Sequence, residues 1–155
     1  MSEDDEIARS VQGHGWHCIA VEESTEEAQF AYTIGFASTF EHPELVVVGL
    51  SRDIAHRLLS DVADDLRKGI RCSPEKTRDD LLEGFSVAFR EVHRTQIAVR
   101  MGYTMAFYRK SRSMAWTALQ LFWPDKQGRF PFEPGCDMKV CLLQSRLDIP
   151  SPSVI

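Results

Sequence analysis

The sequence predicts an α+β fold, with a mostly antiparallel sheet or half-open barrel of about six strands and two main helices. Three observations support this prediction. Residues 29–50 have the pattern of a strand, a polar turn and a second strand, and residues 51–68 have the clearest helical period. Further strand patterns follow over residues 85–90 and 115–123. Strands, then a helix, then more strands are typical of an α+β domain.

Residues 29–50 form the stretch around which the rest of the chain is organised. Large apolar residues alternate with smaller ones, which suits a strand with one large apolar face: Phe30, Tyr32, Ile34 and Phe36. Residues 45–50 are almost wholly apolar and suit a strand that is covered on both faces. The turn between the two strands is polar, and Pro43 fixes its backbone before the second strand.

The helix over residues 51–68 has recognisable ends. Ser51 suits its N-cap, and Gly69 suits the position just beyond its C-terminus. Its apolar stripe repeats every four residues: Ile54, Leu58, Val62 and Leu66. His56 lies outside this stripe, so we expect a solvated surface histidine.

The remaining elements follow from periodicity and from breaks in it. Residues 16–22 predict a first strand after the flexible Gly13–Gly15 turn. Residues 71–80 predict an exposed loop, and residues 95–109 predict a helix that Gly102 weakens. Residues 115–123 predict a central strand that Pro124 ends. We expect a last strand over residues 138–144. A single domain over residues 13–147 would then lie between a loose lead-in, residues 1–12, and a frayed tail, residues 148–155.

Composition excludes several classes of partner. The chain has 155 residues and 43% hydrophobic residues, which suits one domain with a real core. A net charge of −5 offers no basic footprint for a nucleic acid. The acidic N-terminus is not a secretory signal, and no apolar run suggests a membrane span, so we expect a cytoplasmic protein. The four cysteines form no CxxC pair and fit neither a zinc ribbon nor a disulfide framework.

Three residues are candidates for catalysis. His42 and Glu44 flank Pro43, whose extended backbone would let the two side chains point to one side. Such a pair can perform general acid–base chemistry near neutral pH, or it can pin the turn. Asp125, at the end of a buried strand, is either catalytic or a turn-forming residue. The sequence contains no esterase nucleophile elbow, P-loop or Rossmann fingerprint.

Other residues are candidates for binding. Four aromatic residues could converge into a flat apolar pocket for a planar ligand or a peptide: Trp16, Tyr32, Trp123 and Phe130. Three hydroxyl-bearing residues, Thr33, Ser38 and Thr39, lie in or beside the turn. His14 and His17 are weak candidates for a metal, because residues three apart on a strand face opposite sides unless the glycine turn bends His14 round. Otherwise no metal site is expected.

Four phrases together resemble the DUF4262 family, an uncharacterised bacterial family: GW at Gly15–Trp16, FAYTIGF at Phe30–Phe36, HPELVVVGL at His42–Leu50 and WPDKQGRFPFEPG at Trp123–Gly135. The resemblance spans residues 16–144, with Phe132 where the family pattern has tryptophan. A second resemblance is to flavin-reductase-like split barrels, in which hydroxyl and backbone groups after the first strand bind the flavin phosphate. Thr33, Ser38 and Thr39 would take that place, although no basic residue lies beside the turn.

Two classes of function follow from these observations. The first is a binding or interaction module, such as a regulatory or immunity-type partner protein, which suits the acidic composition and the absence of a catalytic motif. The second is a small enzyme or a flavin- or cofactor-binding protein that uses a His–carboxylate site in the turn over residues 38–44. The sequence patterns specify no substrate, cofactor or partner.

Overall fold

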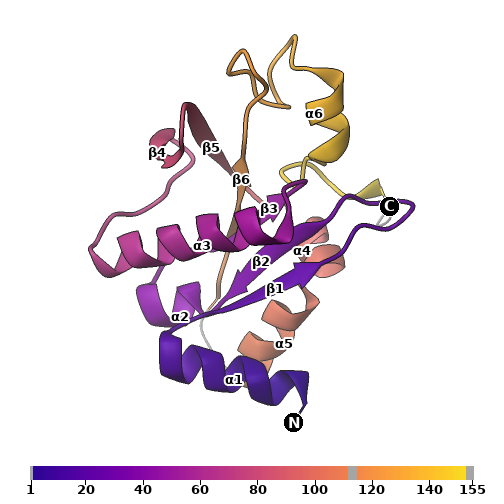
Figure 1. The fold of residues 1–155 in the computed structure, drawn as a ribbon. Helices are drawn as coiled ribbons and strands as arrows, with labels where there is room; N and C mark the ends of the chain where they lie inside the picture. Colours follow the sequence, from indigo (N-terminus) through magenta and orange to yellow (C-terminus); the bar gives the residue numbers. More distant parts are fainter. Residues whose placement is uncertain (1, 112–114, 153–155) are drawn as a thin grey trace.

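The computed structural model describes residues 2–111 and 115–152 and confirms the α+β class. Six strands form one open, mixed sheet in the order β1-β2-β3-β6-β5-β4 (Figure 1). Every neighbouring pair is antiparallel except β3 and β6, which are parallel. The mostly antiparallel sheet is therefore confirmed, whereas the sheet does not close into a barrel.

The strands are short, and their order places β1 and β4 at the two edges of the sheet. Their bounds are β1 His17–Val21, β2 Phe30–Ile34, β3 Glu44–Val48, β4 Arg78–Leu82, β5 Phe85–Glu91 and β6 Ala118–Phe122. The predicted strand pair over residues 29–50 is confirmed, because β2 and β3 pair with Tyr32 opposite Val46. The central place of β6 is also confirmed, since it lies between β3 and β5.

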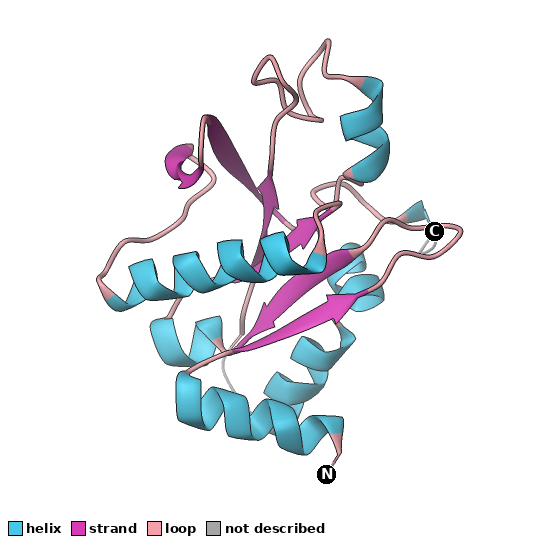
Figure 2. Ribbon diagram, in the orientation of Figure 1, coloured by secondary structure: helices cyan, strands magenta, loops and turns pink. Residues whose placement is uncertain are grey.

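Helices cover both faces of the sheet (Figure 2). Their bounds are α1 Glu3–His14, α2 Phe36–Phe40, α3 Arg52–Arg67, α4 Arg94–Arg100, α5 Gly102–Lys110 and α6 Met138–Leu143. Leu58, Leu59 and Val62 of α3 pack on one face, in a cluster with Val47 and Leu121. Helices α1, α4 and α5 contribute Ile7, Ile97 and Phe107 to the core of the other face.

The predicted helix over residues 51–68 is confirmed together with its ends. Ser51 accepts a hydrogen bond from the backbone N–H of Ile54, and Gly69 follows the helix with φ +85°. His56 is exposed, as expected, but its ring stacks on Trp16 with the centroids 5.9 Å apart.

The predicted helix over residues 95–109 is confirmed in part, because α4 and α5 cover it with a break at Met101. Three other local predictions were wrong. The turn between β2 and β3 contains the short helix α2. Residues 138–143 form helix α6 rather than a strand, because Asp137 caps the backbone N–H of Lys139 and the segment contains good helix formers. Within the predicted loop, β4 pairs with β5 although it carries charged residues.

The two ends of the described chain make specific contacts. Helix α1 covers residues 3–14, and its Ile7 is buried in the core. Near the C-terminus, Gln96 donates to the carbonyl of Ile149, and the N–H of Ser151 donates to Thr95. Part of the predicted tail, residues 153–155, lies outside the described residues. The division at residues 12 and 147 stays a prediction.

Candidate functional site

The side chain of Glu44 is completely buried, and five donors surround its carboxylate. The Thr33 hydroxyl donates at 2.6 Å, and the backbone N–H groups of Gly35, Phe36 and Ala37 donate at 3.2, 3.0 and 3.1 Å. The Tyr108 hydroxyl from α5 is the fifth donor. The carboxylate therefore joins β2, β3, the first turn of α2 and helix α5.

The surroundings act on the pKa of Glu44 in opposite senses. Burial raises the pKa above its ordinary value, while hydrogen bonds from Thr33 and Tyr108 favour the charged form and lower it. Burial likewise raises the pKa of Tyr108. Because all five neighbours donate to it, the carboxylate acts as the acceptor on which the start of α2 is built.

Helix α2 in turn fixes the position of Trp16. The Thr39 hydroxyl of α2 donates to the carbonyl of Gly15 at 2.6 Å, and Arg67 of α3 donates to the carbonyl of His14. Gly35 lies so close to this segment that a Cβ at Gly35 would be 2.6 Å from the Gly15 carbonyl oxygen. The turn between α1 and β1 is thus held from two sides.

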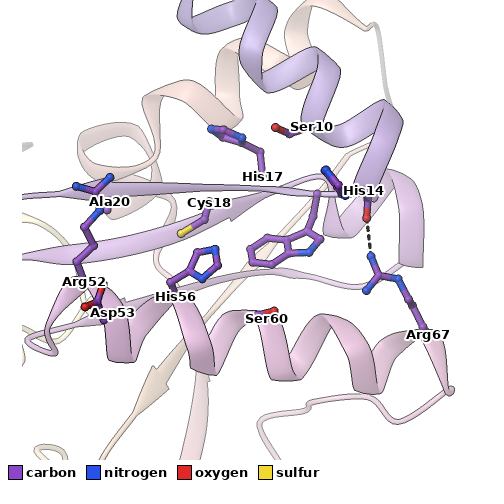
Figure 3. Close-up of a pocket in the computed structure, with 11 residues that line it drawn as sticks. Ser10, His14, His17, Cys18, Ala20, Arg52, Asp53, His56, Ser60 and Arg67 are labelled. Atoms are coloured by element: carbon purple, nitrogen blue, oxygen red, sulfur yellow. Dashed lines mark hydrogen bonds between the residues drawn. The ribbon is translucent and has the colours of Figure 1, made fainter.

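An open cleft of about 650 Å³ lies beside this turn, between α1, β1 and α3. Its lining comes from these three elements and from Trp16 before β1: Ser10, His14, Trp16, His17, Cys18, Ala20, Arg52, Asp53, His56, Ser60 and Arg67. Figure 3 shows His17 on the α1 side of β1 and His56 on the α3 side, with the strand between them. The cleft therefore follows the free edge of β1.

The lining carries more basic than acidic groups. Arg67 is paired with Asp64 at 2.9 Å, whereas no hydrogen bond or ion pair holds the Arg52 guanidinium among residues 2–111 and 115–152. Burial lowers the pKa of His17 and raises the pKa of Cys18 to about 11, while the nearby Arg52 acts against the second shift. Arg52 and Arg67 supply the permanent positive charges of the lining.

His42 is buried and bonded to backbone groups. Its Nε2 accepts from the N–H of Cys72 at 3.1 Å, so its Nδ1 carries the proton that bonds the Pro43 carbonyl at 2.8 Å. Burial lowers the pKa of this imidazole. The expected pairing of His42 with Glu44 is not present among the described residues, because each side chain is bonded to other partners. A catalytic role for either residue stays a prediction.

Asp125 makes the bonds of a turn. Its Oδ1 accepts from the N–H groups of Gln127 and Arg129, both at 2.9 Å, and its Oδ2 accepts from the N–H of Asp137 at 2.9 Å. The bonds from Arg129 and Asp137 lower the pKa of this carboxyl. Asp125 therefore ties the loop after β6 to the start of α6, and its catalytic role also stays a prediction.

The four aromatic candidates for binding are not brought together. Trp16 and Trp123 both pack against the core on the α3 side, whereas Tyr32 lies in the core of the opposite face. Phe130 belongs to a third cluster, where it stacks on Phe132 at 5.3 Å. Of these four residues, Trp16 alone lines the cleft described above.

The hydroxyl candidates have structural partners. Thr33 links Glu44 to the N–H of Leu45, and Thr39 holds Gly15. The Ser38 hydroxyl donates to the carbonyl of Gly35 at 3.3 Å. The weak metal candidates His14 and His17 both line the cleft, and no group of three potential metal ligands occurs within the described ranges.

Sequence reasoning missed the contribution of α3 to the cleft. Arg52, His56 and Arg67 lie on the polar side of an amphipathic helix, where side chains are ordinarily solvated. Of these three residues, only His56 was considered from the sequence, as a surface histidine outside the apolar stripe. Nothing in the pattern indicated that this side of the helix would face the edge of β1.

Together the fold and the site define an α+β domain with a cleft along one sheet edge. The chain belongs to the DUF4262 family, described as a domain of unknown function, whose profile matches residues 10–137. Searches of curated proteins and of solved structures gave no significant match. In the described part of the chain, no helix has the length and hydrophobicity needed to cross a membrane.

Proposed function

We propose that this protein is a binding module and that the cleft along β1 receives its partner. The supporting observation is an open cleft of about 650 Å³, to which three elements contribute polar and basic side chains and Trp16 contributes an aromatic one. Concave sites with one aromatic wall and a few polar groups are the usual form of ligand sites. A regulatory or immunity-type role, in which the partner is another protein, is the form of this proposal that we favour.

The construction of the cleft supports the proposal as well. The ring of Trp16 makes an edge-to-face contact with Phe36, with centroids 5.5 Å apart, and a stacked contact with His56 at 5.9 Å. Thr39 and Arg67 hold the two residues that precede it. A side chain that is held in place before a ligand arrives loses little conformational freedom on binding. The cytoplasmic location and the absence of a nucleic-acid partner stay predictions from the sequence.

Photo-crosslinking from the cleft tests the proposal. We would place p-benzoylphenylalanine at His56, which is exposed and lines the cleft, and irradiate cells that express the full chain. The expected result is a discrete adduct whose added mass distinguishes a small molecule from a protein. The matched control carries the same residue at Lys126, which is exposed in the loop after β6. Equal labelling from both positions, or none from position 56, would contradict the proposal.

A second candidate is a small enzyme or cofactor-binding protein that uses the turn over residues 38–44. The observation in its favour is a separate cavity of about 240 Å³, which Glu41, His42, Pro43 and Trp116 help to line. Glu41 has the positive φ of 53°, and such backbone strain recurs at functional sites. A flavin absorbance band in the purified native protein would support this candidate. His42→Ala would then abolish activity with stability retained, whereas a lower melting temperature with ligand binding retained would make His42 structural.

A further inference from the structure

The outer edge of β1 carries backbone N–H and C=O groups that face away from the sheet. Gly49 N–H donates to the carbonyl of Gln29, so the backbone groups of Gln29 and Ala31 face β3. Those of Phe30 and Tyr32 then face β1, because backbone groups alternate along a strand. Since Tyr32 lies opposite Ile19, the N–H and C=O groups of Cys18 and Ala20 point away from β2. No strand within the described ranges pairs with them.

The cleft has the form of a groove around this edge. Cys18 and Ala20, whose backbone groups face outward, both line it. His17 flanks the strand on the α1 side, whereas His56 flanks it on the α3 side (Figure 3). An extended peptide presents its side chains alternately to two sides while its backbone pairs with an edge, so its shape matches this groove.

The charge of the groove selects among extended peptides. The chain has a net charge of −5, yet Arg52 and Arg67 outnumber Asp53 in the lining. Arg52 is the more available of the two arginines, because Arg67 already bonds Asp64 and the His14 carbonyl. A second copy of β1 would bring no acidic residue within its own strand, HCIAV, so the added strand itself would offer Arg52 no carboxylate.

We propose that the β1 edge binds an acidic, extended segment of a partner protein as an added strand, with Arg52 pairing to one of its carboxylates. This inference rests on the proposed function of the cleft. Backbone pairing with Cys18 and Ala20 supplies affinity without sequence preference, and the groove supplies the preference for acidic residues. The partner is thus defined by an extended backbone that is free of proline and by carboxylates at alternate positions.

Selection from a display library of random short peptides on the full chain tests this inference. We expect the selected peptides to be rich in Asp and Glu and poor in Pro. Arg52→Glu should weaken a selected peptide by about tenfold, because it places like charges together. Arg57→Glu is the matched control, since Arg57 is also exposed on α3 and does not line the cleft. This variant should bind like the parent protein.

Two further measurements address the backbone pairing. Ala20→Pro removes an N–H that faces outward and should abolish binding, with circular dichroism showing that the fold persists. If that variant does not fold, slowed hydrogen exchange at Cys18 and Ala20 in the complex of the parent protein replaces it. A proline at the centre of the selected peptide should likewise abolish binding.

Different experimental outcomes would contradict different parts of the proposal. Selected peptides without acidic enrichment, or equal losses in Arg52→Glu and Arg57→Glu, would overturn the acidic partner. Unchanged exchange at Cys18 and Ala20 would overturn the added strand. Dimerisation of the parent protein through β1 would assign the edge to a second copy instead. A small-molecule adduct at position 56 with no selected peptide would overturn this inference while the cleft remained a binding site. Absence of any adduct at position 56 would contradict the proposed function itself.

Discussion

The two edges of the sheet are built in opposite ways. The β4 edge carries three successive charged residues, Arg78, Asp79 and Asp80, and its pairing with β5 has an irregular register between Arg78 and Leu82. The β1 edge has neither a charged residue nor a proline in its strand, HCIAV, and it opens into the cleft. Charges and register irregularities are the usual means of stopping strand addition at an edge. Their presence at β4 and absence at β1 distinguish a closed edge from an open one.

One helix is common to both edges, since α3 contacts β1 and β4. Near its end, Asp65 bonds Arg78 of β4 at 2.6 Å, and Arg67 bonds the His14 carbonyl in front of β1. The same helix therefore takes part in closing one edge and in forming the wall of the cleft at the other. Changes that affect one edge and not the other are the sharpest tests of this comparison.

The largest effect is expected from Glu44→Ala. It would leave the buried donors of α2, Thr33 and Tyr108 without their acceptor, and we expect a loss of about 3–5 kcal/mol in the free energy of unfolding. Urea denaturation measures this loss, with Glu75→Ala, an exposed residue, as the control. Hydrogen exchange should rise first around α2 and β1 and last at β4 and β5. An equal rise in hydrogen exchange at both edges would show that the hydrogen bonds of Glu44 do not act locally.

The next largest effect is expected at the closed edge. Arg78→Ala removes bonds to Asp65 and Asp80, both of 2.6 Å, from a largely buried guanidinium. Hydrogen bonds between charged groups are strong enough that we expect a loss of about 2 kcal/mol in the free energy of unfolding. Arg57→Ala serves as the control in the same denaturation experiment. Ligand binding in the cleft should persist, and its loss would mean that the two edges are not independent.

A smaller effect is expected from the shared helix. Ser51→Ala removes the side-chain bond to the N–H of Ile54, and loss of an N-cap costs about 1 kcal/mol. Because Arg52 and Asp53 follow directly, this variant should also weaken binding in the cleft. Ser73→Ala, which removes a local turn contact to Glu75 N–H, is the control. A variant that binds as well as the parent would show that the end of α3 is not needed in the cleft.

The sequence was informative where one local signal decides the structure. The alternation of Phe30, Tyr32 and Ile34 predicted β2, and the Ser51 cap with Gly69 predicted both ends of α3. The prediction of a strand at residues 138–144 was wrong because an apolar run of that length suits a strand or a helix equally well. The Asp137 side chain caps the first turn of α6, and this contact favours the helix.

The candidate site was less predictable because it depends on contacts between distant segments. Glu44 was singled out from its place beside Pro43, but its five donors include Tyr108, far along the chain. Helix α2 forms where a loop was expected because the buried carboxylate accepts from its first amides. The cleft required α3 to face β1, and no residue pattern within either element specifies that pairing.

The smallest effect is expected from His42, which is linked to the closed edge through Cys72. Its ring bonds the backbone of Cys72, and the Cys72 sulfur lies 3.8 Å from an Arg78 nitrogen of β4. Because burial lowers the pKa of folded His42 below its ordinary value of 6.5, the unfolded chain binds its proton first as pH falls. The free energy of unfolding should therefore decrease with falling pH from about 6.5 down to the folded pKa, and level off below it.

Denaturation at several pH values tests this link. His42→Gln should flatten the slope below pH 6.5, because the variant has no group at this position that the unfolded chain protonates first. Leu59→Ala is the control, since it lowers stability through a core cavity and leaves every titrating group in place. An equal slope in His42→Gln and the parent would assign the acid sensitivity to another group, such as His17, whose pKa burial also lowers.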